Sequence, residues 1–469
     1  MRTIGFLAPW AIACITATLS GATPKAPPEY TAHEWGTFTS IQGSDGIPIP
    51  WNPLAISDLP DFVHSRQNPA MGPAINPYRP LLSQLDGKGA TTWLQRMETP
   101  VIYFHSKEAL EVSVRVDMPS GRLTEWFPAA FAYGPLPAIS GFLPGSTNSY
   151  LEWPGLAILP SARPGDVVGR LPHLDAPSHY YAARQVTASP VRTTIGAACT
   201  RDGVGENEQF VFYRGVANFT APLRVRSAAH SLIIENTGAT PIVSAFVWQA
   251  QGSVASFTRL GPLEPGATSR MDVPAARAGE PRPALAKRLQ QQMSGALVAA
   301  GLNREEAAAM IATWRDSWFD EDGTRVLYLV PRAFVDATLP VTFDPPPSRL
   351  ERVFVGRAEV IDAAREQRGD ELFAEFRKAH DPAILSGFHG LVAPRFADAL
   401  LTAIGNRQIA AQPATQRNPG NEPGTQLPEV LRILEDLQKV RTELTPLVQR
   451  TASTSGRPST LGTVAANAR

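Results

Sequence analysis

Strict alternation runs through Leu110-Glu111-Val112-Ser113-Val114-Arg115-Val116-Asp117-Met118, in which every even-numbered residue is apolar and every odd-numbered residue is polar or charged. A period of two is typical of a strand with one buried face. Pro119-Ser120-Gly121 then supplies turn residues, and Arg122–Phe127 is a second strand-like run. The stretch therefore predicts a β-hairpin and indicates that this half of the chain is built from sheet.

Short strand-like runs continue outward from this hairpin. They lie at 101–104, 210–213, 232–235 and 242–248. Proline contributes 44 of the 469 residues, roughly twice the usual share of about 5%, which favours strands and loops over long helices. We therefore predict a β-sandwich-type region over residues 29–275.

The pattern changes in the C-terminal half, where helical runs alternate with apolar strand-like runs. Asn303 followed by Glu306 matches a capping box at a helix start, and Trp314 and Trp318 then fall at helical spacing on its core side. We expect an α+β region over 283–410. The predicted class is thus α+β: a β-sandwich-rich N-terminal part, a mixed α/β C-terminal region and a tethered C-terminal helix. The sequence leaves open whether the two regions share one core.

The C-terminal end contains one strongly amphipathic segment. Residues 412–428 are predicted to be a linker, 429–450 an amphipathic helix and 451–469 a disordered tail. The helix has apolar residues spaced by three and four, namely Val430, Ile433, Leu437, Val440, Leu444 and Leu447. Such a stripe needs a cover in water, and we expect the chain's own body to supply it, ahead of a second copy or another envelope component.

The first 22 residues have the organisation of a secretory signal peptide. Arg2 precedes an apolar run from Ile4 to Leu19, and small residues allow cleavage after Ala22. Residues 23–28 follow as a Pro-rich leader. We therefore expect a periplasmic or extracellular protein with no transmembrane segment after removal of the signal peptide (1–22).

Composition and charge exclude several classes of function. Lys and Arg together number 43, as do Asp and Glu, whereas nucleic-acid-binding chains are usually basic. Of the two cysteines, Cys14 leaves lipidation as an alternative, and Cys199 alone cannot form an internal disulfide. The chain has no His-Glu-x-x-His, Gly-x-Ser-x-Gly, P-loop or dinucleotide-binding signature. No cofactor follows from these motifs, and the expected partner is a carbohydrate or an envelope protein rather than nucleic acid.

Two resemblances to known proteins add to this interpretation. The opening Thr31-Ala32-His33-Glu34-Trp35-Gly36-Thr37-Phe38-Thr39, with 98–104 and 212–215, resembles a family of exported bacterial proteins of unknown function that open with a His-Glu-Trp-Gly-Thr-Phe motif. This resemblance implies export and carries no activity. Residues 206–274, with the turn Leu263-Glu264-Pro265-Gly266, resemble immunoglobulin-like sandwich modules. That resemblance implies a β-sandwich, which hosts many functions.

The opening motif offers a first candidate site. His33 and Glu34 could form a polar pair at a cleft, and we expect a strand here with Trp35 on the face opposite His33. The alternative, which we prefer, is an edge strand whose polar residues face water.

Glutamate directly precedes tryptophan three times in the chain. Acids beside aromatic rings suit a sugar site, because rings stack on sugars and carboxylates act as acid, base or nucleophile. The catalytic candidates are Glu34, Glu125 and Glu152, and the ligand-binding candidates are His33, Trp35, Trp126 and Trp153. The alternative that we prefer packs the tryptophans into the core and leaves the glutamates in water.

Two loops offer candidate metal ligands. His173 and Asp175, with His230 or His179 as the second imidazole, match the composition of the two-His, one-carboxylate iron site. An oxygen-rich turn could hold calcium without the EF-hand spacing, through Asp202, Glu206 and Glu208.

Taken together, the missing catalytic signatures and the neutral charge favour an exported, non-catalytic binding or envelope-associated protein. One alternative is an exported hydrolase, with glycosides as the first substrate class, that uses the glutamates beside tryptophan. The other is a metal-binding oxidoreductase that uses His173, Asp175 and His230.

Overall fold

The computed structural model describes residues 29–53, 59–66, 92–135, 148–167, 171–174, 178–193, 205–228, 231–272, 281–388, 390–412 and 429–454. The predicted signal peptide, the leader and all but the first residue of the predicted linker lie outside these residues. The described chain is α+β, as predicted, and its sheets are open. Within it, no helix combines the length and apolar character needed to span a membrane.

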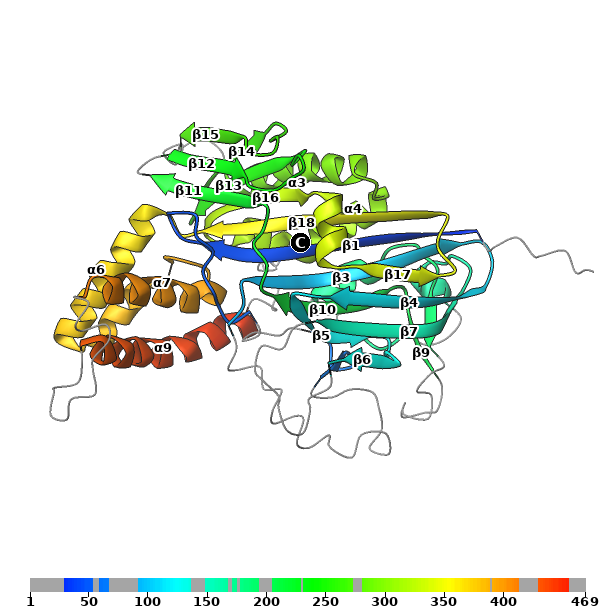
Figure 1. Ribbon diagram of the computed structural model, residues 1–469, viewed down its shortest axis with the longest axis horizontal. Helices are drawn as coiled ribbons and strands as arrows, with labels where there is room; N and C mark the ends of the chain where they lie inside the picture. The colour runs from blue at the N-terminus through cyan, green and yellow to red at the C-terminus, as the bar shows by residue number, and fades with distance from the viewer. Residues whose placement is uncertain are drawn as a thin grey trace, which may run out of the picture.

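A nine-stranded sheet forms the centre of the molecule (Figure 1). Its only parallel pair among the described strands is β1 with β18, at the middle of the sheet. In order across the sheet, the strands are β14 (Val254–Leu260), β13 (Ala245–Gln251), β16 (Gly323–Val330), β18 (Arg349–Val360), β1 (Tyr30–Gln42), β3 (Gln95–Ser106), β10 (Val211–Ala217), β5 (Gly121–Phe127) and β2 (His64–Ser65). Strands from both predicted regions therefore join in one sheet, and the two regions share a core.

Two smaller sheets accompany the large one. The six-stranded sheet contains β17 (Val341–Asp344), β4 (Leu110–Met118), β7 (Ser149–Ile158), β8 (Val191–Thr193) and β9 (Glu206–Glu208), with β6 (Ala132–Gly134) beside β7. The three-stranded sheet contains β11 (Leu223–Ala228), β12 (Ser231–Asn236) and β15 (Thr268–Asp272). The strands from β9 to β15 are thus distributed over all three sheets.

The predicted hairpin at 110–127 is wrong in its pairing, although both strands exist. β4 pairs with β7 and β17, whereas β5 pairs with β10 and β2 in the large sheet. Burial explains the separation: β4 alternates between buried and partly exposed residues, but every residue of β5 is buried. The chain therefore turns at Pro119 and Ser120 from one layer into the other.

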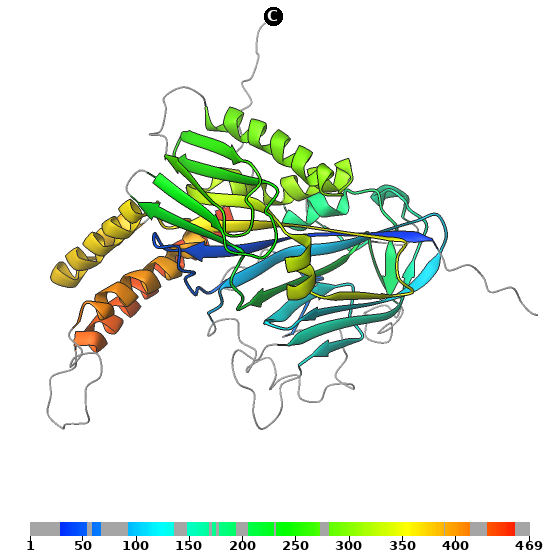
Figure 2. The same ribbon diagram turned by 45° about the horizontal axis from the view of Figure 1, so that its top comes forward.

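Three apolar clusters hold the layers together. The first lies between the large sheet and the two smaller ones. The second lies on the other face of the large sheet, under α2 (His179–Arg184), α3 (Arg282–Ala299), α4 (Arg304–Arg315) and η3 (Asp316–Asp320). The third lies at one end of the sheet, among α6 (Ala363–Ala379), η4 (Pro382–Phe388), η5 (Pro394–Phe396), α7 (Ala397–Ala410) and α9 (Glu429–Thr454) (Figures 1 and 2).

The C-terminal helix α9 packs against its own chain. Ile433, Leu437, Val440 and Leu444 are buried in the third cluster. Two ion pairs tie the helix to its neighbours. Asp436 of α9 pairs with Arg377 of α6 at 3.1 Å, and Arg441 of α9 pairs with Asp398 of α7 at 2.5 Å. The helix continues to Thr454, four residues past the predicted end.

Candidate metal centre

His33 and His105 lie on neighbouring strands and on the same face of the large sheet. His33 is opposite Tyr103 and His105 is opposite Thr31 in the antiparallel pair β1–β3, so the two histidines are diagonal neighbours. Their ring centroids are 4.9 Å apart. This face is the one covered by α3 and α4.

The structure corrects the predicted surroundings of His33. Trp35 lies on the same face as His33, because residues two apart on a strand share a face. Glu34 points to the opposite face, so His33 and Glu34 do not form a pair. The preferred alternative of an edge strand is also wrong, since β1 lies in the interior of the sheet and Glu34 is fully buried.

Glu306 reaches the two histidines from the first turn of α4. The predicted capping box is confirmed: the Glu306 amide donates to Asn303 Oδ1 at 2.8 Å, and the Asn303 amide donates to Glu306 Oε2 at 2.9 Å. Fixing the start of the helix in this way also fixes the Glu306 carboxylate, which is fully buried against β1 and β3.

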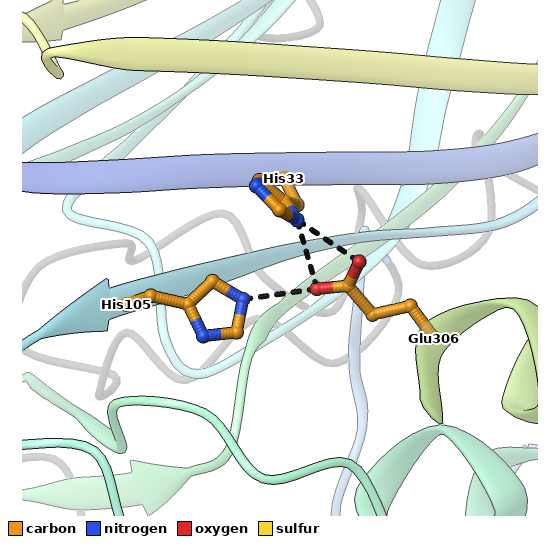
Figure 3. Close-up of side chains that lie close together, drawn as sticks. All are labelled: His33, His105 and Glu306. Atoms are coloured by element: carbon orange, nitrogen blue, oxygen red, sulfur yellow. Dashed lines mark hydrogen bonds and ion pairs between the residues drawn. The ribbon is translucent and has the colours of Figure 1, made fainter. Parts of the chain in front are cut away.

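The carboxylate binds both imidazoles, as Figure 3 shows. His33 Nδ1 lies 2.9 Å from Oε2 and 3.1 Å from Oε1. His105 Nε2 lies 2.9 Å from Oε1. Because an ionised carboxylate only accepts hydrogen bonds, each of these ring nitrogens carries a proton in this arrangement.

The charge of Glu306 is set by opposing effects. Burial raises its pKa, but the hydrogen bonds from His105, His33 and the Asn303 backbone outweigh burial and lower the pKa to about 2. Its place at the N-terminal end of α4 also favours the negative charge. The Glu306 carboxyl group is therefore ionised at any pH near neutrality.

These three side chains have the composition of a metal site. Their ligand atoms all lie within 4.8 Å of one another, and no other trio of such side chains in the described ranges does so. Zinc–ligand distances near 2.1 Å in a tetrahedron place ligand atoms about 3.4 Å apart. The hydrogen-bonded atoms would separate by about half an ångström to admit such an ion, which rotation of the two imidazoles can supply.

The three glutamates predicted to be catalytic are not brought together. Glu34 accepts hydrogen bonds from Tyr213 and Arg352 between the sheets. Glu125 pairs with Arg214 at 3.0 Å on the helical side of the large sheet. Glu152 pairs with Arg115 on the six-stranded sheet. Each carboxylate thus has its own arginine and faces a different layer.

The three tryptophans predicted as ligand platforms are core residues. Trp35 lies in the second cluster, and Trp126 and Trp153 lie in the first. Each is at most 2% exposed, so none offers a ring face to a sugar. Of the ligand-binding candidates, His33 alone belongs to the new site.

The loop candidates are only partly described. Asp175, His230 and Asp202 lie outside the described residues. His173 is in an exposed loop, and the ring of His179 packs against Trp314 at 5.7 Å.

The two described calcium candidates already have side-chain partners within the protein. Glu206 contacts His64 at 2.8 Å, and Glu208 contacts Arg184 at 2.5 Å and Tyr180 at 3.2 Å.

Sequence reasoning missed His105 and saw only the capping role of Glu306. The only sequence signal for His105 is that it directly follows the strand-like run 101–104, and a histidine in that position does not by itself indicate a metal ligand. Comparison adds no further residue: the chain matches no protein family model, and no curated protein is detectably similar to it.

Proposed function

We propose that this protein is a metalloprotein that holds one divalent transition-metal ion through His33 Nδ1, His105 Nε2 and the Glu306 carboxylate. The observation that supports this is the convergence of three donors from β1, β3 and α4 within 4.8 Å. Two imidazoles and one carboxylate match both hydrolytic zinc sites and non-haem iron sites. Zinc is the first candidate because it binds such a site more tightly than ferrous iron does.

The coordination set favours catalysis over a purely structural role. Structural zinc sites are closed by four protein ligands, whereas catalytic sites have three and leave a position for water. The His33 and His105 side chains are 13% and 23% exposed, so solvent reaches the rings that would carry the ion. An ion held by His33, His105 and Glu306 would supply Lewis acidity and a water of lowered pKa for the hydrolysis of carbonyl or phosphoryl groups.

The proposed reaction class is therefore metal-assisted hydrolysis in an exported protein. This proposal revises the hydrolase interpretation of the sequence, because the reaction is assigned to His33, His105 and Glu306 instead of the glutamates beside tryptophan. Export, and the periplasmic or extracellular location, remain predictions from residues 1–22.

A second function is favoured by the hydrogen bonds themselves. With suitable tautomers, both imidazoles donate to Glu306 without any ion. The trio could then serve only to clamp α4 onto the sheet of a non-catalytic binding protein. A measurement of metal affinity distinguishes these two functions, because the clamp needs no metal ion.

The test is calorimetric titration of chelator-treated full-length protein with Zn²⁺, followed by elemental analysis. We expect one equivalent of zinc. Loss of a residue behind a metal ligand typically weakens affinity 10–100-fold, so His105→Asn, which removes a ligand, should weaken it by at least about 100-fold.

His380→Asn is the matched control, because His380 is an exposed histidine at the left-handed end of α6, where asparagine is tolerated. Zinc binding unchanged by His105→Asn, or lost equally in His380→Asn, would refute the proposed centre.

A further inference from the structure

A row of charged and hydroxyl side chains crosses the large sheet on its helical face, beyond Trp35 from the metal centre. Its members are side-by-side residues of six adjacent strands: Arg325 (β16), Arg357 and Glu359 (β18), Thr37 and Thr39 (β1), Arg96 and Glu98 (β3), Arg214 (β10) and Glu125 (β5). All of them are at most 7% exposed. We call this set the polar row.

The two ends of the polar row are internally satisfied. Arg325 pairs with Glu359 at 3.0 Å and donates to backbone carbonyls around η3. At the other end, Arg214 pairs with Glu125 at 3.0 Å. These ends need no additional partner.

The centre of the polar row is different. Thr37 Oγ1, Thr39 Oγ1, Glu98 Oε1 and Arg357 Nη1 are buried and make no hydrogen bond. In register, Thr39 is opposite Arg357 and Thr37 is opposite Glu98, so the four atoms belong to neighbouring positions on three adjacent strands. Buried polar groups are normally paired, because leaving them unpaired costs free energy. Four such atoms together need partners from outside the chain, either ordered water or a bound ligand.

The backbone is irregular at the same place. The register of β1 with β3 shifts between Trp35 and Thr37, and β3 carries the extra residue. Thr99, next to Glu98, has φ of +46°, which is costly for a β-branched residue and persists where the surroundings demand it. Bulges of this kind re-aim side chains and are frequent beside active sites. Segments 33–39, 98–104 and 212–215, singled out in the sequence, meet at this irregularity.

Arg395 connects the centre of the polar row to solvent. It comes from η5, approaches Glu98 Oε1 with Nη1 at 3.8 Å and pairs with Glu321. The Arg395 side chain is 19% exposed and that of Glu321 is 21% exposed. A movement of Arg395 would therefore open the centre from outside without unpacking the sheet.

The charge and donor pattern define the ligand. Glu359 also pairs with Arg357, at 3.0 Å. Counted over the whole polar row together with Arg395 and Glu321, five guanidinium groups face four carboxylates, and this excess of one positive charge favours an anion. Arg357 and the threonine hydroxyls supply donors. Glu98 Oε1, which makes ion pairs with Arg96 and Arg395 but accepts no hydrogen bond, is an acceptor only, and it repels an anion unless that anion brings a proton.

We propose that the centre of the polar row binds a small oxyanion that carries one protonated oxygen, with hydrogen phosphate as the simplest example. Thr37, Thr39 and Arg357 donate to its charged oxygens, and its hydroxyl donates to Glu98 Oε1. Arg395 moves from Glu98 onto the ligand. Sulfate has the same shape but no proton near neutral pH, so this site should discriminate against it.

The test compares phosphate with sulfate by calorimetric titration of the full chain at pH 7. The titrated protein carries His105→Asn and the buffer contains chelator, so that an anion bound to a metal ion does not contribute to the measured affinity. We expect phosphate to bind at least 10-fold more tightly than sulfate. Glu98→Gln replaces an acceptor oxygen by an amide that can donate, and should reduce or reverse that preference.

Matched variants separate the site from general effects of buried substitutions. Thr39→Val removes a donor from the centre and should weaken phosphate binding at least 10-fold. Thr313→Val is the control, because Thr313 also has a buried, unpaired hydroxyl but lies on α4. Circular dichroism establishes that each variant is folded.

Three outcomes would overturn the proposal. These are no phosphate binding by the folded parent protein, equal affinity for phosphate and sulfate that Glu98→Gln leaves unchanged, or equal losses in Thr39→Val and Thr313→Val. If Glu98→Gln does not fold, the Thr39→Val and Thr313→Val pair decides. Because the metal centre is disabled throughout, these results do not depend on whether zinc binds.

Discussion

The Glu306 carboxylate has two roles in the folded protein. It closes the capping box of α4 with Asn303 and also accepts hydrogen bonds from His33 and His105. The sequence predicts the first role, because a capping box is local and its residues lie three positions apart. It cannot predict the second, because Glu306 is 273 positions from His33 and 201 from His105. Only the pairing of β1 with β3 and the docking of α4 bring them together.

The low pKa of Glu306 predicts how stability depends on pH. Its pKa falls from 4.5 in the unfolded chain to about 2 in the folded protein. The stabilisation is therefore complete above pH 4.5 and is lost as pH falls through the folded value. A shift of this size corresponds to roughly 3 kcal/mol. Glu306→Gln should lower the free energy of unfolding by up to that amount at pH 7, and by less than about half of it at pH 3.

Urea unfolding in the presence of chelator measures this difference. Glu305→Gln is the control, because Glu305 is the neighbouring carboxylate on α4 and contacts the Thr187 amide instead of the histidines. An equal deficit of Glu306→Gln at pH 7 and pH 3 would show that its charge contributes nothing.

At the scale of single elements, sequence patterns located strands and helices better than they identified which elements pack or pair together. The alternation of 110–118 located β4, yet the short connection to β5 suggested a pairing that does not form. Strand pairing depends on contacts far apart in the chain, and the complete burial of β5 depends on layers that the local sequence does not reveal. The charged residues of the polar row likewise look solvent-exposed in sequence and are buried in the structure.

The helix α9 is an element whose partner the sequence did anticipate. Leu437 is 6% exposed and packs in the third cluster, whereas Leu434 on the same helix is 46% exposed. Leu437→Ala should therefore destabilise the protein by about 2–5 kcal/mol, and Leu434→Ala by less than about 0.5 kcal/mol. Scanning calorimetry measures the difference, and light scattering checks that neither change alters the oligomeric state. Equal losses would contradict the packing of Leu437 in the third cluster, and a change of oligomeric state would place the apolar stripe of α9 against a second copy.

At the scale of the whole molecule, the proposed metal centre links parts of the chain that lie far apart in sequence. His33 and His105 lie on central strands of the sheet, and Glu306 lies on the helical layer above them. The unfolded chain does not hold these three side chains together, so the proposal implies that zinc binds the folded state preferentially. Binding must then stabilise the fold, by about 2.7 kcal/mol when free zinc is 100 times its dissociation constant.

This linkage predicts a zinc-dependent melting temperature. For chains of 150–250 residues, each kcal/mol raises the melting temperature by about 2–4 °C, and a larger chain responds less per kcal/mol, so we expect a rise of a few degrees. Chelator should reverse the rise, and magnesium should not reproduce it, because magnesium prefers oxygen ligands. His105→Asn should abolish the zinc effect while His380→Asn retains it. A rise of the same size in His105→Asn would mean that zinc binds elsewhere, leaving Glu306 and its two histidines as a clamp between helix and sheet.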